Sequence, residues 1–170
     1  MASFLKELSL ALGLLTSDQS PVPDADGWQG YVWRIRDAGT CLATDARGLC
    51  HLVHDRWDWK REQWYDISFG SDPENNIVNL RLTIDNRDPS DQDRVCVVVL
   101  FIDDRDEEVA VYYSNWLSFP GRVIDRTTPL KPARDIGSIA KVAVGSKQCD
   151  GASPRDADLY MRARYKLDQR

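Results

Sequence analysis

Histidine is scarce in this sequence of 170 residues, which contains only His51 and His54. Because histidine is the most frequent general acid or base, acid–base catalysis has little material here. The nucleophile motif Gly-x-Ser-x-Gly and the glycine-rich phosphate loop are both absent. We therefore do not expect an enzyme. The alternative is an unrecognised hydrolase, since 27 Asp and Glu residues make any choice of catalytic carboxylates arbitrary.

Long apolar runs are absent as well. No stretch approaches the roughly 20 apolar residues that a membrane-spanning helix needs, so we expect no membrane span. The formal net charge of −5 argues against nucleic acid as a partner. Hydrophobic residues make up 42% of the chain, which is ordinary for a single globular domain with its own core.

The clearest structural pattern lies between residues 77 and 113. In residues 78–85, apolar side chains alternate with polar ones, which is typical of a strand with one buried face. Residues 95–102 are apolar throughout and rich in β-branched side chains, which predicts a strand covered on both faces. A third strand follows the charged run at 103–108. We expect these three strands to form an antiparallel meander.

Similar alternation and turn residues predict strands elsewhere in the chain. The expected ranges are 31–36, 40–43, 49–54, 63–69, 123–124, 136–144 and 159–167, with a loop or edge strand at 127–134. Short strands at this spacing indicate an all-β fold. We expect an antiparallel β-sandwich, immunoglobulin-like or C2/jelly-roll-like, with a short N-terminal amphipathic helix. The expected organisation is a helix at 1–16, a linker at 17–27 and the β-sandwich domain at 28–170.

The N-terminal segment places apolar residues at helical spacing, namely Phe4, Leu8, Ala11, Leu12 and Leu15. A weak signal peptide, or its remnant, is the alternative interpretation. A helix of this length is marginal alone in water, so the domain, a partner protein or a membrane must cover its apolar stripe. Only Lys6, offset by Glu7, is available to contact lipid headgroups. We therefore favour docking into a groove on a protein.

Cys41, Cys50, His51 and His54 form the only cluster with the chemistry of zinc ligands. Their spacing matches no common zinc module. If residues 49–54 form a strand, Cys50 and His54 share one face while His51 points away. The four side chains would then not meet, so we expect no metal and no cofactor. A Cys41–Cys50 disulfide and two free thiols are the alternatives for this pair.

The other two cysteines have different surroundings. Cys96 lies inside the apolar run at 95–102, which predicts a buried free thiol. Cys149 lies in a predicted polar loop at 145–156, where we expect an exposed thiol that reacts readily with labelling reagents.

Acidic residues crowd two predicted loops, one at 85–93 and one at 103–108. Calcium prefers carboxylate oxygens supplied by such loops. These two loops leave opposite ends of the strand at 94–102, so their carboxylates should not converge on one ion. We expect solvated hairpin tips whose charges keep sheet edges from pairing with other chains.

Tryptophan is concentrated around Trp57, Trp59 and Trp64. Three interpretations stay open: core packing, a protein-binding surface and carbohydrate binding. Trp57 and Trp59 sit two apart, so on a strand they would share a face and form a flat platform for a sugar. Acidic neighbours cancel the local basic charge, which argues against single-stranded nucleic acid.

The leading hypothesis is a non-catalytic protein-binding domain of an accessory or assembly component. Its partner would be another protein or a second copy of the chain, with carbohydrate as the alternative ligand. The expected partner-binding residues are Phe4, Leu8, Leu12, Leu15, Trp57, Trp59 and Trp64. The compartment stays open, with the cytoplasm favoured over a secreted or periplasmic location.

Overall fold

The structure of this chain is a computed structural model. It describes residues 28, 30–41, 43–58, 62–149, 156–158 and 160–161. The helix expected at 1–16 and the linker expected at 17–27 lie outside the described residues. No helix among the described residues is long and apolar enough to cross a membrane.

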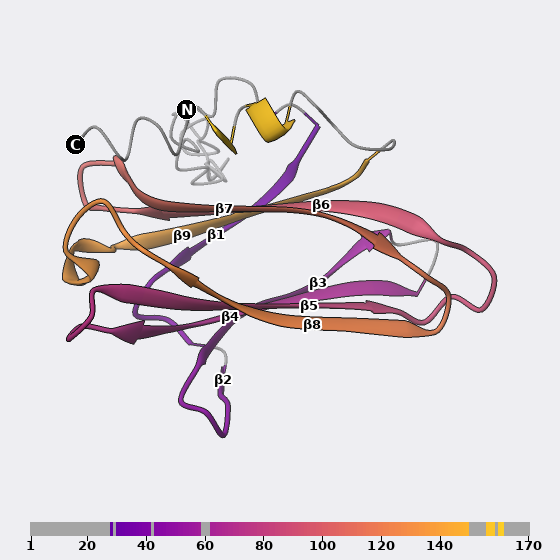
Figure 1. Ribbon diagram of the computed structural model, residues 1–170, viewed down its shortest axis with the longest axis horizontal. Helices are drawn as coiled ribbons and strands as arrows, with labels where there is room; N and C mark the ends of the chain where they lie inside the picture. The colour runs from indigo at the N-terminus through magenta and orange to yellow at the C-terminus, as the bar shows by residue number, and fades with distance from the viewer. Residues whose placement is uncertain are drawn as a thin grey trace, which may run out of the picture.

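Two antiparallel sheets lie one above the other (Figure 1). The upper sheet has the order β1-β9-β6-β7, built from β1 (Val32–Asp37), β9 (Lys141–Gln148), β6 (Asp93–Ile102) and β7 (Glu108–Ser118). The lower sheet has the order β2-β3-β4-β5-β8, built from β2 (Ala43–Thr44), β3 (Cys50–Asp58), β4 (Gln63–Asp72), β5 (Ile77–Asn86) and β8 (Arg122–Leu130). A short 3-10 helix, η1 (Ile136–Ser138), precedes β9. The expected all-β, antiparallel architecture is confirmed.

Strands β5 and β6 show how the sequence pattern becomes a core. Alternate residues of β5 are buried, and those between them are partly exposed. On β6, Val97 and Val99 join the large core between the sheets, whereas Val98 and Leu100 join a second core on the outer face of the four-stranded sheet. Both strand predictions are therefore confirmed, including the burial of β6 on two faces.

The predicted meander is only partly correct. β6 and β7 pair as a hairpin, but β5 pairs with β4 and β8, while β6 pairs with β7 and β9. The chain thus crosses from one sheet to the other between β5 and β6. The physical reason is that β5 has a polar face that needs water, whereas β6 has none. Each strand belongs to the sheet whose outer face matches it.

Several strand boundaries also differ from the predictions. β3 and β4 run on to Asp58 and Asp72, and β9 continues through Gly145 to Gln148. Gly145 is required there because a Cβ would lie 2.9 Å from the Trp33 ring. β8 continues to Leu130 as an edge strand, where a proline is tolerated.

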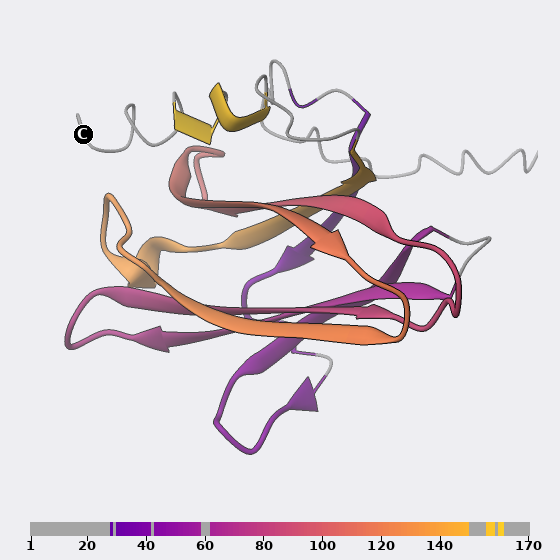
Figure 2. The same ribbon diagram turned by 45° about the vertical axis from the view of Figure 1, so that its right-hand side comes forward.

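The last predicted strand, at 159–167, is wrong where the structure describes it. Residues 156–158, 160 and 161 are helical, and they lie above the four-stranded sheet (Figure 2). Asp156 is buried and Tyr160 packs against the second core. These two residues are four apart, which places both on one side of a helix. The apolar residues of this segment alternate as in a strand, but Asp156 and Tyr160 also have the four-residue spacing of a helix. The helical spacing is the one that the structure adopts.

The expectation of a free thiol at Cys96 is also wrong, because Cys96 and Cys149 form a disulfide. The Cys149 amide donates to the Arg94 carbonyl at 2.8 Å, which extends the β9–β6 pairing past the end of β9. Cys149 is consequently buried and not exposed, and its Cα lies 5.9 Å from that of Cys96, within the usual range for a disulfide.

The second pair, Cys41 and Cys50, also forms a disulfide, with a Cα–Cα distance of 5.2 Å. It closes the hairpin that contains β2 and leads into β3. Cys41 and Cys50 are therefore bridged and are not free thiols. No thiolate remains at either position to bind zinc.

Candidate functional site

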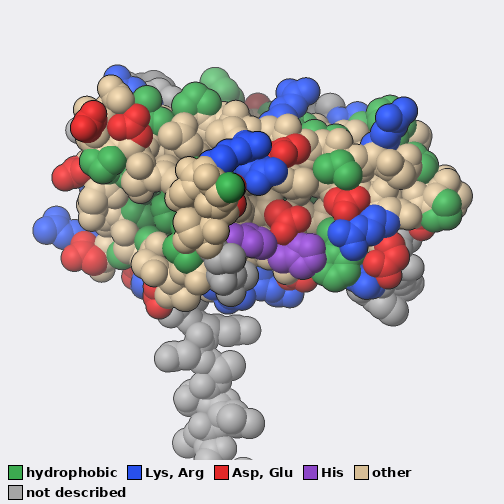
Figure 3. Space-filling view, turned by 90° about the horizontal axis from the view of Figure 1, so that it is seen from below, with side chains coloured by type: hydrophobic (Ala, Val, Ile, Leu, Met, Phe, Trp, Pro, Cys, Tyr) green, Lys and Arg blue, Asp and Glu red, His purple; other side chains and the backbone are tan. Residues whose placement is uncertain are grey.

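The outer face of the five-stranded sheet carries polar and charged side chains from β3, β4 and β5. Figure 3 shows this face, where both histidines lie together among acidic and basic residues. On β5 the outward residues are those that alternate with the buried apolar ones, and they include Arg81, Thr83 and Asp85. Most of these side chains are partly exposed, and the hairpin of β2 projects below the sheet (Figure 1).

A bulge in β3 places His51 and His54 on the same face. The register pairs His51 with Ser68 but Val53 with Ile67, so Leu52 is an extra residue in β3. Leu52 and Val53 are both buried as a result. The expectation that His51 points away from His54 is therefore wrong, because it assumed a strand without a bulge.

Both histidines contact one carboxylate on the neighbouring strand. The His54 Nδ1 lies 2.7 Å from Asp66 Oδ1, and the His51 Nε2 lies 3.2 Å from the same oxygen. The His51 Nε2 also lies 3.1 Å from the Val53 carbonyl oxygen. Asp66 therefore orients both imidazoles. Among the described residues, no group of three or more His, Cys, Asp or Glu side chains is arranged to hold a metal ion.

Beside the histidines, Arg81 forms a two-pronged ion pair with Asp125 of β8. Its Nε and Nη2 donate to the two carboxylate oxygens at 2.8 Å and 2.7 Å. Thr83 donates to the same carboxylate at 3.4 Å. The hydrogen bonds from Arg81 lower the pKa of Asp125, so the pair remains ionised well into acid solution.

Asp45 reaches the same region from the loop between β2 and β3. Its Oδ2 lies 3.4 Å from the Arg81 Nη1, while its Oδ1 accepts hydrogen bonds from the backbone amides of Arg47 and Leu49. These bonds, that from Leu49 first, lower the pKa of Asp45. The carboxylate is therefore ionised and fixed in place by its own loop.

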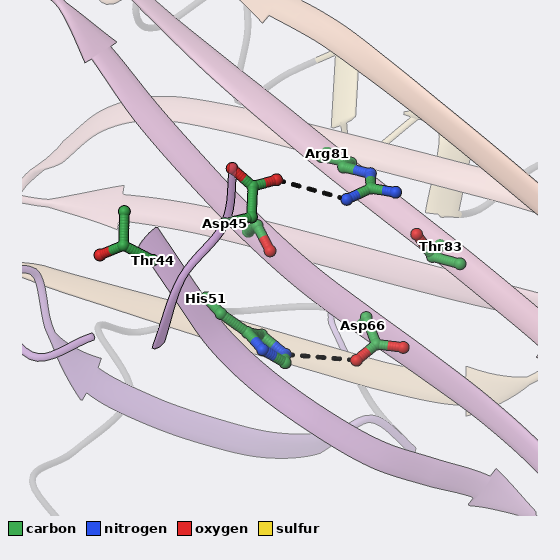
Figure 4. A pocket seen from close by; sticks show the side chains of 7 residues that line it. Thr44, Asp45, His51, Asp66, Arg81 and Thr83 are labelled. Atoms are coloured by element: carbon green, nitrogen blue, oxygen red, sulfur yellow. Dashed lines mark hydrogen bonds and ion pairs between the residues drawn. The ribbon is translucent and has the colours of Figure 1, made fainter. Parts of the chain in front are cut away.

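These side chains surround a cavity of about 280 Å³ between the β2–β3 hairpin and the sheet (Figure 4), which we call the polar pocket. It is lined by Thr44, Asp45, His51, Asp66, Ser68, Arg81 and Thr83. Every lining residue is polar or charged. The Cys41–Cys50 disulfide holds the hairpin that forms one wall.

A second group on the same face surrounds Trp64 of β4, and we call it the Trp64 cluster. The Arg56 Cζ lies 4.4 Å from the centre of the Trp64 ring, and that of Arg87 lies 5.7 Å away. The His54 ring stacks on the indole with centroids 4.5 Å apart, and the indole N–H donates to Glu62. Salt bridges join Arg56 to Glu62 and Arg87 to Asp85.

The other residues expected to bind a partner are placed differently. Trp57 is partly buried and packs against the core between the sheets. Trp59, Phe4, Leu8, Leu12 and Leu15 lie outside the described residues. Sequence reasoning missed Asp66 and Arg81, although their outward positions on alternating strands could have been read from periodicity.

The acidic loop at 103–108 is held by ion pairs. Asp103 accepts the backbone amides of Arg105 and Glu107 and pairs with Arg134. Burial raises the pKa of Asp103, but these hydrogen bonds and Arg134 outweigh burial and leave it below the usual value. Asp106 pairs with Lys141 at 3.1 Å. The hydrogen bonds and ion pairs of these acidic residues stabilise the loop that connects β6 to β7.

The Trp64 cluster and the polar pocket are the two candidate binding sites on this face of the five-stranded sheet. No protein-family model matches the chain, and no curated protein matches it. The Trp64 cluster presents a fixed aromatic ring among opposite charges. The polar pocket presents converging hydrogen-bonding groups in a small cavity.

Proposed function

We propose that this chain is a non-catalytic protein-binding domain of an accessory or assembly component. We further propose that its fold is a β-sandwich, immunoglobulin-like or C2/jelly-roll-like, as two stacked antiparallel sheets around one core support. The observation that carries the functional proposal is the Trp64 cluster on the open face of the five-stranded sheet.

Trp64 has the properties of a binding anchor. Tryptophan and arginine are the residues most enriched among interface residues that dominate affinity. The stacking on His54 and the guanidinium of Arg56 restrict the indole before any partner arrives, so less side-chain entropy is lost on binding. The surrounding charges of both signs supply the polar rim that selects a partner of complementary charge.

The N-terminal segment is the second proposed docking element. Its apolar stripe of Phe4, Leu8, Leu12 and Leu15 needs a cover, and a groove on a partner protein suits it better than lipid. Deletion of residues 1–16 should leave the domain folded and abolish recovery of the partner or self-association. Unfolding of the shortened chain would instead make the segment part of the core.

The Trp64 cluster is tested by comparing Trp64→Ala with Phe119→Ala. Phe119 is also an aromatic residue, 50% exposed, and it follows the end of β7. Affinity capture from an extract of the native source measures binding to a partner protein, and sedimentation of the pure chain measures self-association. For Trp64→Ala, the affinity for the partner or for a second copy should fall about thirtyfold. Phe119→Ala should bind as the unchanged chain does. Equal binding by both variants would refute the proposal.

The carbohydrate platform expected from Trp57 and Trp59 gains no support. Trp57 is only partly exposed and packs against the core between the sheets. Trp59 lies outside the described residues. We therefore keep protein binding as the proposed function of the aromatic residues.

For the compartment, we propose an oxidising environment, secreted or periplasmic, in place of the cytoplasm that the sequence favours. The supporting observation is that all four cysteines pair in two disulfides. Such bonds persist outside the reducing cytosol. Intact-mass measurement of the native chain after alkylation without a reductant should detect no added label. Labelling of all four cysteines would favour the cytoplasm instead.

A further inference from the structure

We propose that the polar pocket binds the ring of a neutral sugar. This site differs from the Trp64 cluster, and it differs from the platform of Trp57 and Trp59. The proposal does not depend on protein binding, so either one can fail without the other.

The size and lining of the pocket limit its ligand. A cavity of about 280 Å³ lies just below the 300–1,000 Å³ usual for drug-sized ligands, so the ligand is a small one. Ligand pockets are lined mostly by apolar and aromatic side chains. Every lining residue here is polar or charged. A suitable ligand should therefore offer several hydrogen-bonding groups to these side chains.

The charges around the pocket exclude an anion. Asp45 and Asp66 contribute two carboxylates, against one guanidinium from Arg81. A phosphate or carboxylate ligand would meet both acidic groups at close range. Because like charges at such distances repel, the pocket disfavours an anionic ligand.

A cation is also a poor match. The Asp45 carboxylate already accepts two backbone amides and faces Arg81, and the Asp66 carboxylate already contacts both histidines. Any cation would also lie near the Arg81 guanidinium. Each carboxylate can still accept a single further hydrogen bond, and a neutral hydroxyl group can donate that bond.

The pocket offers both donors and acceptors to hydroxyl groups. In the described part of the chain, Asp66 Oδ2 receives no hydrogen bond, and the hydroxyls of Thr44 and Ser68 have no partner. Arg81 has one weakly used nitrogen, because its Nη1 is 3.4 Å from Asp45. Hydroxyl groups donate and accept, so a polyhydroxylated ring can engage this mixed set where a ligand of one kind cannot.

The walls of the pocket are fixed before binding. Arg81 is held by its two hydrogen bonds to Asp125, and Asp66 by the two imidazoles. The hairpin wall that carries Asp45 is closed by the Cys41–Cys50 disulfide. A site arranged in advance loses less free energy to ordering when the ligand binds.

Titrations of the full chain with single compounds test this inference. The neutral probes are the methyl glycosides of glucose, galactose, mannose and N-acetylglucosamine, and the charged probes are inorganic phosphate and methylamine. We expect at least one glycoside to shift the backbone amide NMR signals of Thr44, His51 and Asp66 in a saturable way. Phosphate and methylamine should cause no saturable shift at these residues.

Two pocket variants and one control locate the binding. Asp66→Ala removes carboxylate acceptors, and Thr83→Val removes a hydroxyl with little change of shape. Loss of one hydrogen bond to a charged group predicts about tenfold weaker binding for Asp66→Ala. Asn79→Ala removes a polar side chain from the same face, outside both the pocket and the Trp64 cluster, and should bind as the unchanged chain does.

Three results would overturn the inference. The first is that no glycoside binds at its highest soluble concentration. The second is that a charged probe binds more tightly than every glycoside. The third is that Asp66→Ala and Thr83→Val, shown by circular dichroism to be folded, both bind as tightly as Asn79→Ala. Tenfold weakening confined to the pocket variants would support it.

Discussion

Among the described residues, other parts of the chain cover the outer face of the four-stranded sheet, while the outer face of the five-stranded sheet has no such cover. Trp28, Tyr31 and Cys149 cover the outward side chains of β6 and form the second core with them. Tyr160, from the helical stretch above this sheet (Figure 2), packs against the same core. The open face carries the polar pocket and the Trp64 cluster.

The buried carboxylate of Asp156 connects the cover to the four-stranded sheet. The Tyr31 hydroxyl donates to Asp156 at 3.0 Å, and the Lys147 ammonium lies 2.7 Å from the same carboxylate. Lys147 also lies 4.5 Å above the Tyr31 ring. Residues more than a hundred positions apart in the sequence are thus joined over β9. One face of the four-stranded sheet is thus packed beneath other parts of the chain.

The two disulfides should differ in their effect on stability. Cys96–Cys149 lies in the covered face, whereas Cys41–Cys50 closes the β2 hairpin, with Cys50 packed against the core between the sheets. Replacing Cys96 and Cys149 by alanine opens a loop with a separation of 53 residues, and replacing Cys41 and Cys50 opens one with a separation of 9. The chain-entropy relation predicts losses of about 4 and about 2.7 kcal/mol in the free energy of unfolding. Urea denaturation measures both. Equal losses would mean that loop length does not set the difference between the two disulfides.

Truncation on the two outer faces should also give unequal results. Leu100→Ala removes a side chain that is 1% exposed, although it points away from the core between the sheets. We expect a loss of about 3 kcal/mol for this variant, since it leaves a cavity beneath the cover. Thr83→Ala on the open face should cost less than about 0.5 kcal/mol. A small loss for Leu100→Ala would show that the cover does not pack as described.

Alkaline pH should weaken the covered face first. Burial, and then the Asp156 carboxylate, raise the pKa of Tyr31. The unfolded chain ionises this tyrosine near pH 10 while the folded chain keeps its proton, so stability is present below pH 10 and falls above it. Tyr31→Phe should reduce that fall by up to about 1.4 kcal/mol per pH unit. Chemical denaturation between pH 9 and 11 measures the two slopes, which should not coincide.

The smallest effect is expected from the ion pair on the open face. The pKa of Asp125 is lowered by its hydrogen bonds with Arg81, so its stabilisation is present above about pH 4 and is lost as pH falls. Because the pair is partly exposed, Asp125→Asn should cost less than about 1 kcal/mol at pH 7. The difference from the unchanged chain should shrink as pH falls below about 4. A constant difference over this range would assign the effect to packing.

Strand positions were largely predictable, because period-two alternation depends on neighbours in the chain. Val78, Leu80 and Leu82 turn inward as their spacing predicts, and Arg81 turns outward between them. Residues 78–85 alternate apolar and polar side chains, whereas residues 95–102 are apolar throughout. This difference already indicated that β5 and β6 belong to sheets with different outer faces. The predicted meander overlooked that contrast.

The candidate site was much less predictable. His51 and His54 share a face only because Leu52 is an extra residue in β3, and a bulge of this kind leaves no mark in the sequence. Asp66 meets them through the pairing of β3 with β4, and Asp125 meets Arg81 across 44 positions. No local pattern records such distant partners.

The sequence by itself determined that the chain forms short strands, which side chains each strand buries, and that β6 is covered twice. These properties follow from hydrophobic spacing along a few residues. Tertiary structure alone decided the order of strands in each sheet, the Cys96–Cys149 disulfide and the assembly of the polar pocket. The reason is that hydrogen bonding and packing between distant residues select the strand partners. The local alternation of apolar side chains does not indicate which distant strand that partner is.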